Sequence, residues 1–415
     1  MQLRAALDPL LLDITIATRS VLRNRRRSGL AIAATTFGVV AMVLAGSFIE
    51  YILWATREGS IETSLGHLQV VRKDFFKRGL ADPLAYLVAD GSVDANALRS
   101  LPHVRTAAPR LSFNGLASHG DTTLSFIGEG VDPAREAEFG KNVVIRAGQD
   151  LAPDHPKSVL VGRGLAANLG VKVGDTLVLL ANTESGGINA VELNVRGLFS
   201  TISKAYDDSA LRVPLATAQE LLRVRGVHRW VVLLDDTDRT DGALAGVRAR
   251  LANDGLEVVP WYDLADFYKK TAALLSRQMD VVRTIVAAIV ILSILNTLTM
   301  SVLERTAEIG TVMALGSRRR QVLRRFLIEG TVIGLVGGLI GVALGFVIAQ
   351  IGSAIGIPMP PPPGMSDGYT ARLMVTPSLL AGAALLASVT AALASLYPAW
   401  KASRLEIVDA LRHSR

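Results

Sequence analysis

Four long runs without a charged residue dominate the pattern of apolar and polar positions along the chain. A helix needs roughly 20 residues to cross about 30 Å of hydrocarbon, and a single segment can pair all of its backbone groups there only as a helix. The pattern therefore predicts four transmembrane helices. The runs lie between Arg27 and Glu50, between Arg283 and Glu304, from Glu329 to about Ile351, and between Arg372 and Lys401.

Shorter patterns fill the roughly 230 residues between the first and second runs. Alternating polarity predicts strands at residues 176–180, 191–195 and 230–234, and helical spacing predicts helices at 216–223 and 241–251. This mixture indicates an α+β domain inserted between the first two transmembrane helices.

Both of these helices are expected to continue beyond the hydrocarbon. Asp263 is a suitable N-cap for a helix that continues to Leu303, because neither glycine nor proline occurs before Gly310. Those 41 residues would span about 61 Å as a helix, roughly twice the hydrocarbon thickness. Residues 51–63 are expected to extend the first helix in the same way, although Gly59 weakens the helical pattern.

Lysine and arginine are distributed unevenly among the short loops. Six precede the first run, six lie between the second and third, and four follow the fourth, whereas the loop between the third and fourth carries only Arg372. Because cytoplasmic loops carry such an excess, both termini and the loop at residues 304–329 are expected in the cytoplasm. The predicted fold is thus a membrane protein: an α-helical bundle of four transmembrane helices with a large extracytoplasmic α+β domain inserted between helices 1 and 2.

Composition agrees with this fold and excludes several functions. The mean hydropathy is +0.36 and half of the residues are apolar, as expected for a chain that meets lipid. The absence of cysteine excludes disulfides, thiol catalysis and cysteine-ligated zinc. The predicted cytoplasmic segments account for more than the whole net charge of +7 and leave the inserted domain at −2, so nucleic acid is not an expected partner.

The boundaries of the expected segments follow from these patterns. The Pro-rich outer loop contains Pro358 and Pro360–Pro363, a stiff strap typical of polyproline II. The segments are: 1–27, a cytoplasmic amphipathic N-terminal segment; 28–55, helix 1 and its stalk; 56–262, the periplasmic domain; 263–303, the second stalk and helix 2; 304–329, a cytoplasmic loop; 330–352, helix 3; 353–372, the outer loop; 373–400, helix 4; and 401–415, a cytoplasmic tail.

Known catalytic patterns are absent from the sequence. It contains no GxSxG, no HExxH and no phosphate-binding GxxxxGK[ST] loop. The six histidines lack the spacing of metal ligands and are expected to be surface or packing residues. We therefore expect no catalytic residue, no metal and no cofactor in this chain.

The loop at residues 304–330, ERTAEIGTVMALGSRRRQVLRRFLIEG, carries the most distinctive pattern. Ile309, Val312, Met313 and Leu315 predict a short amphipathic helix, Gly316 can adopt the left-handed conformation that ends it, and Ser317 can cap the next helix. A short helix tied to two spans suits a groove on another protein. Spacing alone allows equally an interfacial helix that touches only lipid.

This loop, followed by GLVGGLIGVALG, resembles the permease signature of FtsX/MacB-type ABC transporters. LRNRRRSGLAIAATTFGVV, GHLQV, VLVGRGLAANLGVKVGDTLVLL with VRGLFST, and YPAWKASRLEIVDALR are also similar to that family, so the resemblance covers nearly the whole chain. Length and layout are closest to the lipoprotein-releasing LolC/LolE subfamily. The fused ATPase of MacB proper is missing, and FtsX proper has a smaller insert.

The resemblance implies partners and a location for the chain. Two permease chains, identical or homologous, would pair in the bacterial inner membrane with two copies of an ABC ATPase, which would hold ATP and Mg, and a periplasmic carrier or adaptor is possible. The charged residues of the loop would bond the ATPase and the apolar ones would fill its groove. The implied coupling residues are Glu304, Arg305, Glu308, Ile309, Gly310, Met313, Leu315 and Gly316.

Small and polar residues within the runs predict helix packing. Gly334, Gly338, Gly341 and Gly345 have GxxxG spacing, which permits close helix contact either within one chain or between two permease chains. Asn296 is the most polar residue of the second run, and it suits an interhelical hydrogen bond better than a substrate contact.

Two functions fit this sequence. The first is the permease subunit of a mechanotransmitting ABC transporter that extracts or exports a lipophilic substrate or lipoprotein from the outer face of the inner membrane, with ATP hydrolysis in a separate chain. The alternative is a non-transporting signalling subunit that activates an extracytoplasmic partner such as a cell-wall hydrolase. A membrane-anchored enzyme or sensor is a third possibility, but the missing catalytic patterns disfavour the enzyme and the loop at residues 304–330 disfavours a passive anchor.

Overall fold

The computed structural model describes residues 15, 17–19, 21, 23, 25–79, 82–139, 143–201, 203–251, 255–361 and 368–406. The chain divides into two compact units. The helical unit contains residues 1–53, 271–358 and 370–415, and the inserted domain contains residues 54–270 and 359–369.

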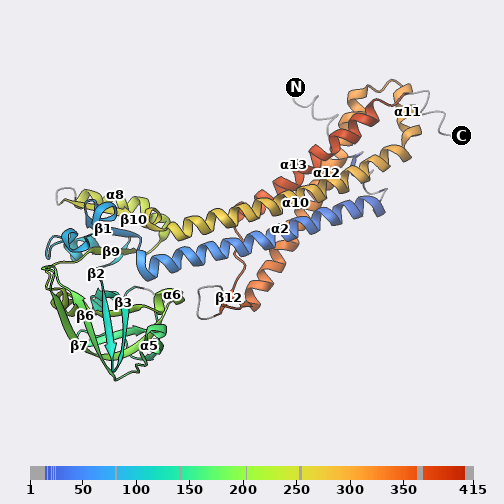
Figure 1. Cartoon of the computed structure of the whole chain (residues 1–415). Coiled ribbons are helices and arrows are strands. Elements are labelled where there is room, and N and C mark those ends of the chain that lie inside the picture. The colour runs from blue at the N-terminus through green and yellow to red at the C-terminus, as the bar shows by residue number, and fades with distance from the viewer. Residues whose placement is uncertain are drawn as a thin grey trace. The chain divides into compact units, whose positions relative to one another are not determined.

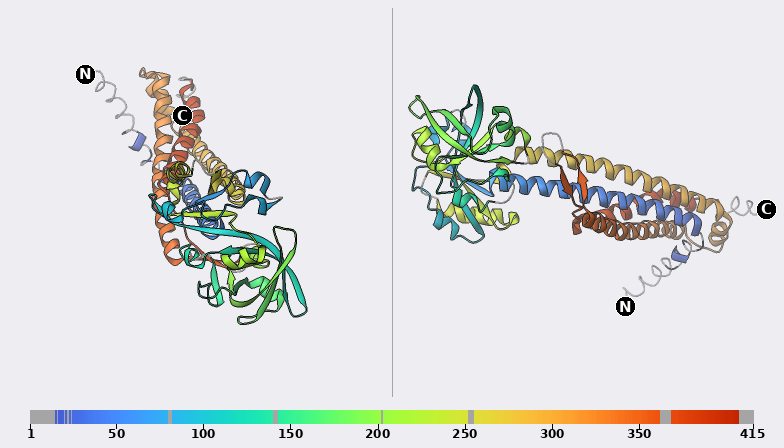
Figure 2. Two further views of the ribbon diagram at one scale, coloured as in Figure 1. Left: turned by 90° about the vertical axis from the view of Figure 1, so that its left-hand side faces the viewer. Right: turned by 90° about the horizontal axis from the view of Figure 1, so that it is seen from below.

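Among the residues that the structure describes, four helices are long and apolar enough to cross a membrane (Figure 1). Figure 2 shows that α2 and α10 run side by side, as do α12 and α13. At 1.5 Å per residue, α2 with 36 residues and α10 with 39 are about 54 and 58 Å long, well beyond the hydrocarbon thickness. Both helices are therefore long enough for the predicted extension. Their bounds are α2 Arg25–Ser60, α10 Asp266–Glu304, α12 Arg319–Ile355 and α13 Pro377–Ser403.

The start of α10 differs from the sequence prediction. Asp263 belongs to a separate short helix, α9 (Trp261–Leu264), and Ala265 leaves the helical conformation with φ −85° and ψ 57°. The Trp261 ring packs edge-on against Tyr268 at 5.5 Å between centroids, which favours the break because the indole becomes buried. The prediction that Asp263 caps the long helix is wrong.

Glycines of α12 form two packing faces within the helical unit. A Cβ at Gly334 would overlap the Cβ of Ala391 on α13, and one at Gly338 would lie 3.3 Å from the Cβ of Ala387. On the other face, a Cβ at Gly341 would lie 2.6 Å from Val39 on α2. Gly345 meets Val43 of α2 at 3.0 Å in the same way. Both GxxxG pairs therefore pack against helices of the same chain in this structure.

A ten-stranded mixed sheet forms the inserted domain, in the order β10-β1-β9-β2-β3-β8-β5-β7-β4, with β6 paired to β2 and β7. The pairs β3/β8 and β5/β7 are parallel, and the other pairs are antiparallel. The strands are β1 Leu68–Arg72, β2 Val104–His119, β3 Thr122–Val131, β4 Val144–Gly148, β5 Ser158–Gly162, β6 Thr176–Asn182, β7 Ile188–Ser200, β8 Ala210–Pro214, β9 Arg229–Leu234 and β10 Leu256–Pro260.

Three hydrophobic cores include residues of the long strand β2, and Ala108 lies in the smallest of them. The first half of β2 pairs with β9, and the second half pairs with β3 and β6. Leu111 and Phe113 lie in one core, whereas Val104 and Ala107 lie in another. The helical elements of the domain are η1 Ile61–Leu65, η2 Phe75–Gly79, η3 Pro83–Tyr86, α3 Ala95–Arg99, α4 Pro133–Glu136, α5 Arg163–Leu169, α6 Lys204–Asp207, α7 Leu215–Leu222, η4 Thr237–Arg239 and α8 Thr240–Arg250.

Part of the outer loop forms a two-stranded sheet of β11 (Ile357–Met359) and β12 (Tyr369–Ala371). Pro358 thus lies in a short strand, while residues 362–367 of the predicted polyproline strap lie outside the described residues. Most of the predicted N-terminal segment and residues 407–415 of the predicted tail also lie outside them.

Candidate functional site

The predicted coupling loop contains a short helix, α11 (Thr306–Ala314), between the end of α10 and the start of α12. Gly316 has a φ of +97°, so it provides the predicted change of direction after α11. The N-cap of α12 is Arg318, whose backbone N–H donates to the Gln321 Oε1 at 2.9 Å. The prediction that Ser317 caps α12 is therefore wrong.

The apolar side of α11 packs against its own chain. Ile309 is 7% and Met313 is 8% exposed, and both lie in one hydrophobic cluster. Gly310 is buried beside them. The other buried members of the cluster are Val302, Val322, Phe326, Ala399 and Ala402. The prediction that Ile309 and Met313 form the face offered to a partner is thus wrong, because an amphipathic pattern does not specify which neighbour covers the apolar side.

Arg305 also has its contacts within the chain. Its Nε donates to Glu308 at 3.1 Å, its Nη1 lies 3.4 Å from the carboxylate of the buried Glu329, and its guanidinium lies 5.8 Å from the Phe326 ring centroid. Arg305 therefore holds the end of α10, α11 and α12 together.

Two ion pairs join the beginning of the first helix to the α11 segment. Arg27 Nη1 lies 2.5 Å from Glu304 Oε1, and Arg23 Nη2 donates to both Glu308 oxygens at 3.3 Å. Hydrogen bonds from Arg305 and Arg23 keep the pKa of the Glu308 carboxyl below its usual value. Arg23 and Arg27 are four residues apart, as are Glu304 and Glu308. The two ion pairs therefore lie one helical turn apart, and we call them the Arg–Glu ladder. Glu304 and Glu308, which the resemblance assigned to a partner, thus pair within the chain, and their pairing with Arg27 and Arg23 was not predicted.

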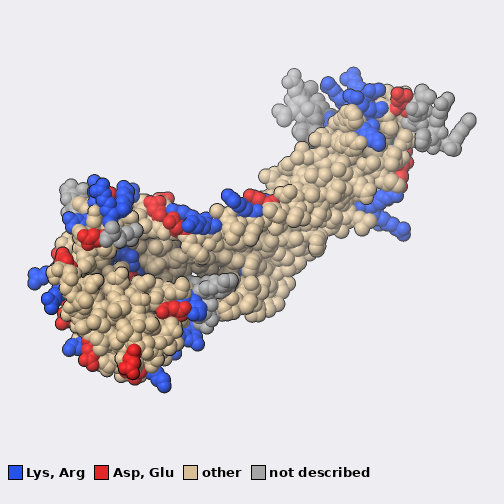
Figure 3. Space-filling view, viewed as in Figure 1, with Lys and Arg blue, Asp and Glu red and all other residues tan. Residues whose placement is uncertain are grey.

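The outward side of this segment is small and apolar. Leu315 is 83% exposed, and Leu303 at the end of α10 is 58% exposed. Thr311, Ala314 and Gly316 are exposed in the same segment. We call these five residues the outer α11 face. Figure 3 shows Lys and Arg gathered at this end of the helical unit, while the visible surface along the helices is almost free of charge. Of the predicted coupling residues, Leu315 and Gly316 are the uncharged ones available to a partner.

Asn296 lies on the outside of α10. Its side chain is exposed, and no hydrogen bond joins it to any other residue in the part of the chain that the structure describes. The predicted interhelical hydrogen bond is therefore not made to a described helix of the same chain, and the prediction stays open for a contact between chains. An amide that faces the hydrocarbon is costly without a partner, so its position is compatible with a contact to a second chain.

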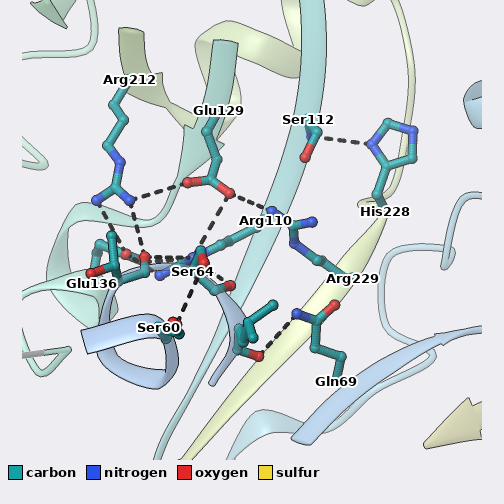
Figure 4. Close-up of polar contacts among 12 residues, drawn as sticks. Ser60, Ser64, Gln69, Arg110, Ser112, Glu129, Glu136, Arg212, His228 and Arg229 are labelled. Atoms are coloured by element: carbon teal, nitrogen blue, oxygen red, sulfur yellow. Dashed lines mark hydrogen bonds and ion pairs between the residues drawn. The ribbon is translucent and has the colours of Figure 1, made fainter. Parts of the chain in front are cut away.

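A buried cluster of charges surrounds the end of the first helix in the inserted domain (Figure 4). Arg110, which is fully buried, donates from Nη1 to the carbonyl oxygens of Thr63 at 3.3 Å and Ser64 at 3.2 Å. Arg212 donates from Nη2 to the same Thr63 oxygen at 3.4 Å. Because these carbonyls end η1, which continues directly from α2, the arginines bind the end of the helix. We name this cluster the stalk socket: Arg110, Glu129, Glu136, Arg212 and Arg229.

Glu129 is the centre of the stalk socket. It lies 3.8 Å from Arg110, 3.2 Å from Arg212 and 2.7 Å from Arg229. Burial alone would raise the pKa of Glu129, but the three arginines outweigh burial and lower it to about 2. The sequence does contain a signal for this cluster, namely single arginines within apolar strands such as ALRVP at Ala210–Pro214.

A second buried network lies beside the first stalk. The His67 Nδ1 accepts the backbone N–H of Leu234 at 3.0 Å, and its Nε2 lies 3.0 Å from the Thr237 hydroxyl, which donates to Glu58. Burial and then the charge of Arg57 lower the pKa of His67 to about 4. Burial and then Arg229 likewise lower the pKa of His228 to about 4.

His67 and His228 should make the free energy of unfolding depend on pH. The unfolded chain binds protons near pH 6.5, whereas the folded chain resists them until about pH 4, so stability is lost as the pH falls through this window. We expect a loss of a few kcal/mol across it, measurable as a fall in the thermal unfolding midpoint of the purified chain between pH 7 and pH 5.

The variant His67→Gln should be less stable at pH 7 and show a flatter pH dependence. The exposed His155 provides the control, since His155→Gln should leave the pH profile unchanged. An unaltered profile in His67→Gln would exclude His67 as a source of the dependence.

Two family models match the chain. Residues 28–250 match the MacB-like periplasmic core domain, and residues 281–407 match the FtsX-like permease C-terminal region. Among the residues that the structure describes, no group of His, Asp and Glu is arranged to hold a metal ion.

Two individual proteins are similar over most of the chain, and one solved structure is similar over about half of it. LolC, the lipoprotein-releasing system transmembrane protein of Xylella fastidiosa (strain Temecula1), is 25% identical over 338 residues, which are 75% of this chain and 78% of that protein. MacB, the macrolide export ATP-binding/permease protein of Hyphomonas neptunium, is 29% identical and matches 96% of this chain but only 60% of its own length. The periplasmic region of MacB from Actinobacillus actinomycetemcomitans is 12% identical, with a TM-score of 0.35 over 49% of this chain and 93% of that structure.

Proposed function

Because this chain belongs to the FtsX/MacB-like family of permeases, we propose that it is the permease subunit of an ABC transporter driven by a separate ATPase. In this proposal the transporter extracts or exports a lipophilic substrate or lipoprotein from the outer face of the bacterial inner membrane. LolC, which is named for lipoprotein release, supports this substrate class by its similarity along three quarters of the chain.

The proposed orientation places both termini and α11 in the cytoplasm and the inserted domain in the periplasm. The uneven distribution of lysine and arginine supports it, because sixteen of these residues lie in the loops assigned to the cytoplasm and one lies in the short outer loop. The gathering of basic side chains around the α11 end agrees with contact to anionic lipid headgroups there.

The continuity of α10 is the observation that carries the mechanism. One unbroken helix runs from Asp266, at the boundary of the inserted domain, to Glu304, and α11 is packed directly beneath its end. A helix of this length transmits axial and tilting movements with little loss, because its backbone hydrogen bonds resist bending. We infer that an ATPase docked on the outer α11 face moves α10, and with it the inserted domain.

The first helix takes part in the same movement through both of its ends. The Arg–Glu ladder joins its beginning to the α11 segment. The stalk socket holds the carbonyls at its far end through Arg110 and Arg212. In this proposal a single docking event therefore moves both stalks. A second permease chain, which Asn296 would face, completes the transporter.

Co-purification with an ATPase tests this function. We expect the tagged chain, expressed with the genes that neighbour its own, to retain an ABC ATPase, and we expect ATP turnover only in that complex because the chain has no phosphate-binding loop. Turnover by the purified chain alone, or the absence of any ATPase in the complex, would contradict the proposal.

A charge exchange tests the ladder. We expect Glu304→Arg to lower substrate-stimulated ATP turnover severalfold, because it places two arginines together, while stability changes by less than about 1 kcal/mol because both groups are partly exposed. Adding Arg27→Glu should restore turnover. The measurement is turnover of the reconstituted complex at equal ATPase content.

The exchange also separates two roles of Glu304. If Glu304 bonds the ATPase instead of Arg27, the double variant remains as impaired as Glu304→Arg alone. The exposed Asp280–Arg283 pair, one helical turn apart on α10, offers a control in which the same exchange should have no effect.

A further inference from the structure

Four large apolar side chains form an exposed stripe along α10. Each of them is between 54% and 68% exposed: Leu274, Val281, Ile285 and Leu292. Their spacings are seven, four and seven residues, which at 3.6 residues per turn keep them within about 40° of one another around the helix. Asn296 follows four residues later on the same side, and we call these five residues the α10 stripe.

The opposite side of α10 is also apolar, but its own chain covers it. Its buried residues belong to the hydrophobic core of the helical unit: Met279, Val286, Val290, Ile294 and Leu298. The described helices of this chain thus cover one apolar side of α10 and leave the α10 stripe facing outwards.

The α10 stripe extends beyond the length that lipid would cover. At about 58 Å, α10 is roughly twice as long as the hydrocarbon is thick. Leu274 and Val281 precede the charge-free run, and the exposed ion pair of Asp280 with Arg283 lies at their level. Water would therefore surround these two side chains in a single chain. Apolar residues that stay exposed to water at a spacing of seven are typical of a helix that pairs with another helix.

Asn296 provides an independent observation. It lies eight residues from Glu304, about 12 Å along the helix and inside the charge-free run. Its exposed amide has no hydrogen bond among the described residues. An amide that faces lipid leaves a donor and an acceptor unpaired, whereas a polar group on a neighbouring helix would pair both. The α10 stripe is therefore unsuited to lipid alone in its middle as well as at its outer end.

The chemistry of the α10 stripe fits a second copy of the same chain. An amide is both donor and acceptor, so two Asn296 side chains related by a twofold axis can bond each other. The other four members are uncharged, so no like charges meet across that axis. A single asparagine in an apolar contact also fixes the register of two paired helices.

From these observations we propose that the α10 stripes of two copies pair as parallel helices, with each residue opposite its own counterpart from Leu274 to Asn296. This inference rests on the proposed function, in which a second permease chain completes the transporter, and it identifies the surface that this second chain covers. The pairing can be tested without an ATPase.

Cysteine cross-linking tests the contact, because the chain has no cysteine of its own. In membrane vesicles treated with copper phenanthroline, Leu274→Cys and Val281→Cys should each give a disulfide-linked dimer. Ser276→Cys is the matched control, because Ser276 is also exposed but lies about 160° around the helix from Leu274. It should stay monomeric.

Variants of Asn296 test the amide. Energy transfer between donor-labelled and acceptor-labelled copies, attached through Ser276→Cys, is followed as the protein is diluted with lipid. We expect Asn296→Leu to weaken pairing about fivefold, the value of one interhelical hydrogen bond, and Asn296→Gln to keep most of it. Neither variant should change the thermal stability of the single chain, because the side chain is exposed there.

Several results would overturn the proposal. Cross-linking of Ser276→Cys as fast as that of Leu274→Cys would indicate random collision. Failure of both Leu274→Cys and Val281→Cys to cross-link, or equal pairing of Asn296→Leu and the unaltered chain, would exclude the α10 contact. Disulfides between Leu292→Cys and Ala33→Cys of another copy would instead assign the α10 stripe to the exposed side of α2. The proposed function would survive each of these results if the chain still retained its ATPase and supported turnover.

Discussion

Replacing Met313 by Asp will destabilise the chain itself, whereas replacing Leu315 by Asp will leave the chain intact and remove its ATPase. Met313 is 8% exposed in the hydrophobic cluster that it shares with Ile309 and Phe326, and an unpaired carboxylate there costs several kcal/mol. Leu315 is 83% exposed, so its replacement changes the free energy of unfolding by less than about 0.5 kcal/mol. At a docked surface the same charge should weaken binding at least tenfold. Membrane level, thermal stability and co-purified ATPase measure these effects.

Conservative variants provide the controls for this pair. Met313→Leu keeps the volume and polarity of the buried side chain and should retain both stability and the ATPase. A Leu315→Asp chain that retains a stoichiometric ATPase and full turnover would contradict docking at the outer α11 face. The interpretation of α11 as a helix that touches only lipid would then be favoured.

Long and strongly periodic features were predictable from the sequence. The four apolar runs and the unbroken helix after Asp266 follow from length and composition, because lipid allows only fully hydrogen-bonded segments. Gly316 was predictable for a different reason. The turn after α11 has a φ of +97°, and glycine is the residue that adopts such a conformation most easily.

Features that depend on which surfaces meet in space were not predictable. The burial of Ile309 beneath α10 and α13 depends on how the helices fold back, and no local pattern records that arrangement. The prediction of Asp263 as the N-cap of α10 was wrong for a similar reason, because the packing of Trp261 decides where α10 begins. Arg110 and Arg212 come together only through the pairing of β2, β3 and β8, which brings distant strands side by side.

The α12 glycines show how a local pattern and its spatial context combine. GxxxG spacing predicts close approach but does not specify the partner helix. In this chain Gly334 faces α13 and Gly341 faces α2, so one helix holds two neighbours through glycines on two sides. The same helix leads directly into the α11 segment, so loss of this packing should weaken the support of the docking surface as well.

The variant Gly334→Ala should destabilise the helical unit by about 1–3 kcal/mol, although alanine is the better helix former by about 1 kcal/mol. The reason is steric, because the added Cβ would overlap the Cβ of Ala391 on α13 and force the two helices apart. The free energy of unfolding of the full chain in mixed micelles measures the effect. Gly382→Ala on α13 is the matched control, because a Cβ there meets nothing within 4 Å, and it should be neutral or slightly stabilising.

A compensating change then identifies the partner of Gly334. Ala391→Gly removes the opposing Cβ, so the double variant Gly334→Ala with Ala391→Gly should recover most of the lost stability. Recovery at a protein concentration too low for pairing of two chains would locate the contact within one chain. If Ala391→Gly restores nothing, and the defect of Gly334→Ala instead depends on protein concentration, the glycine face would have to be assigned to a second permease chain.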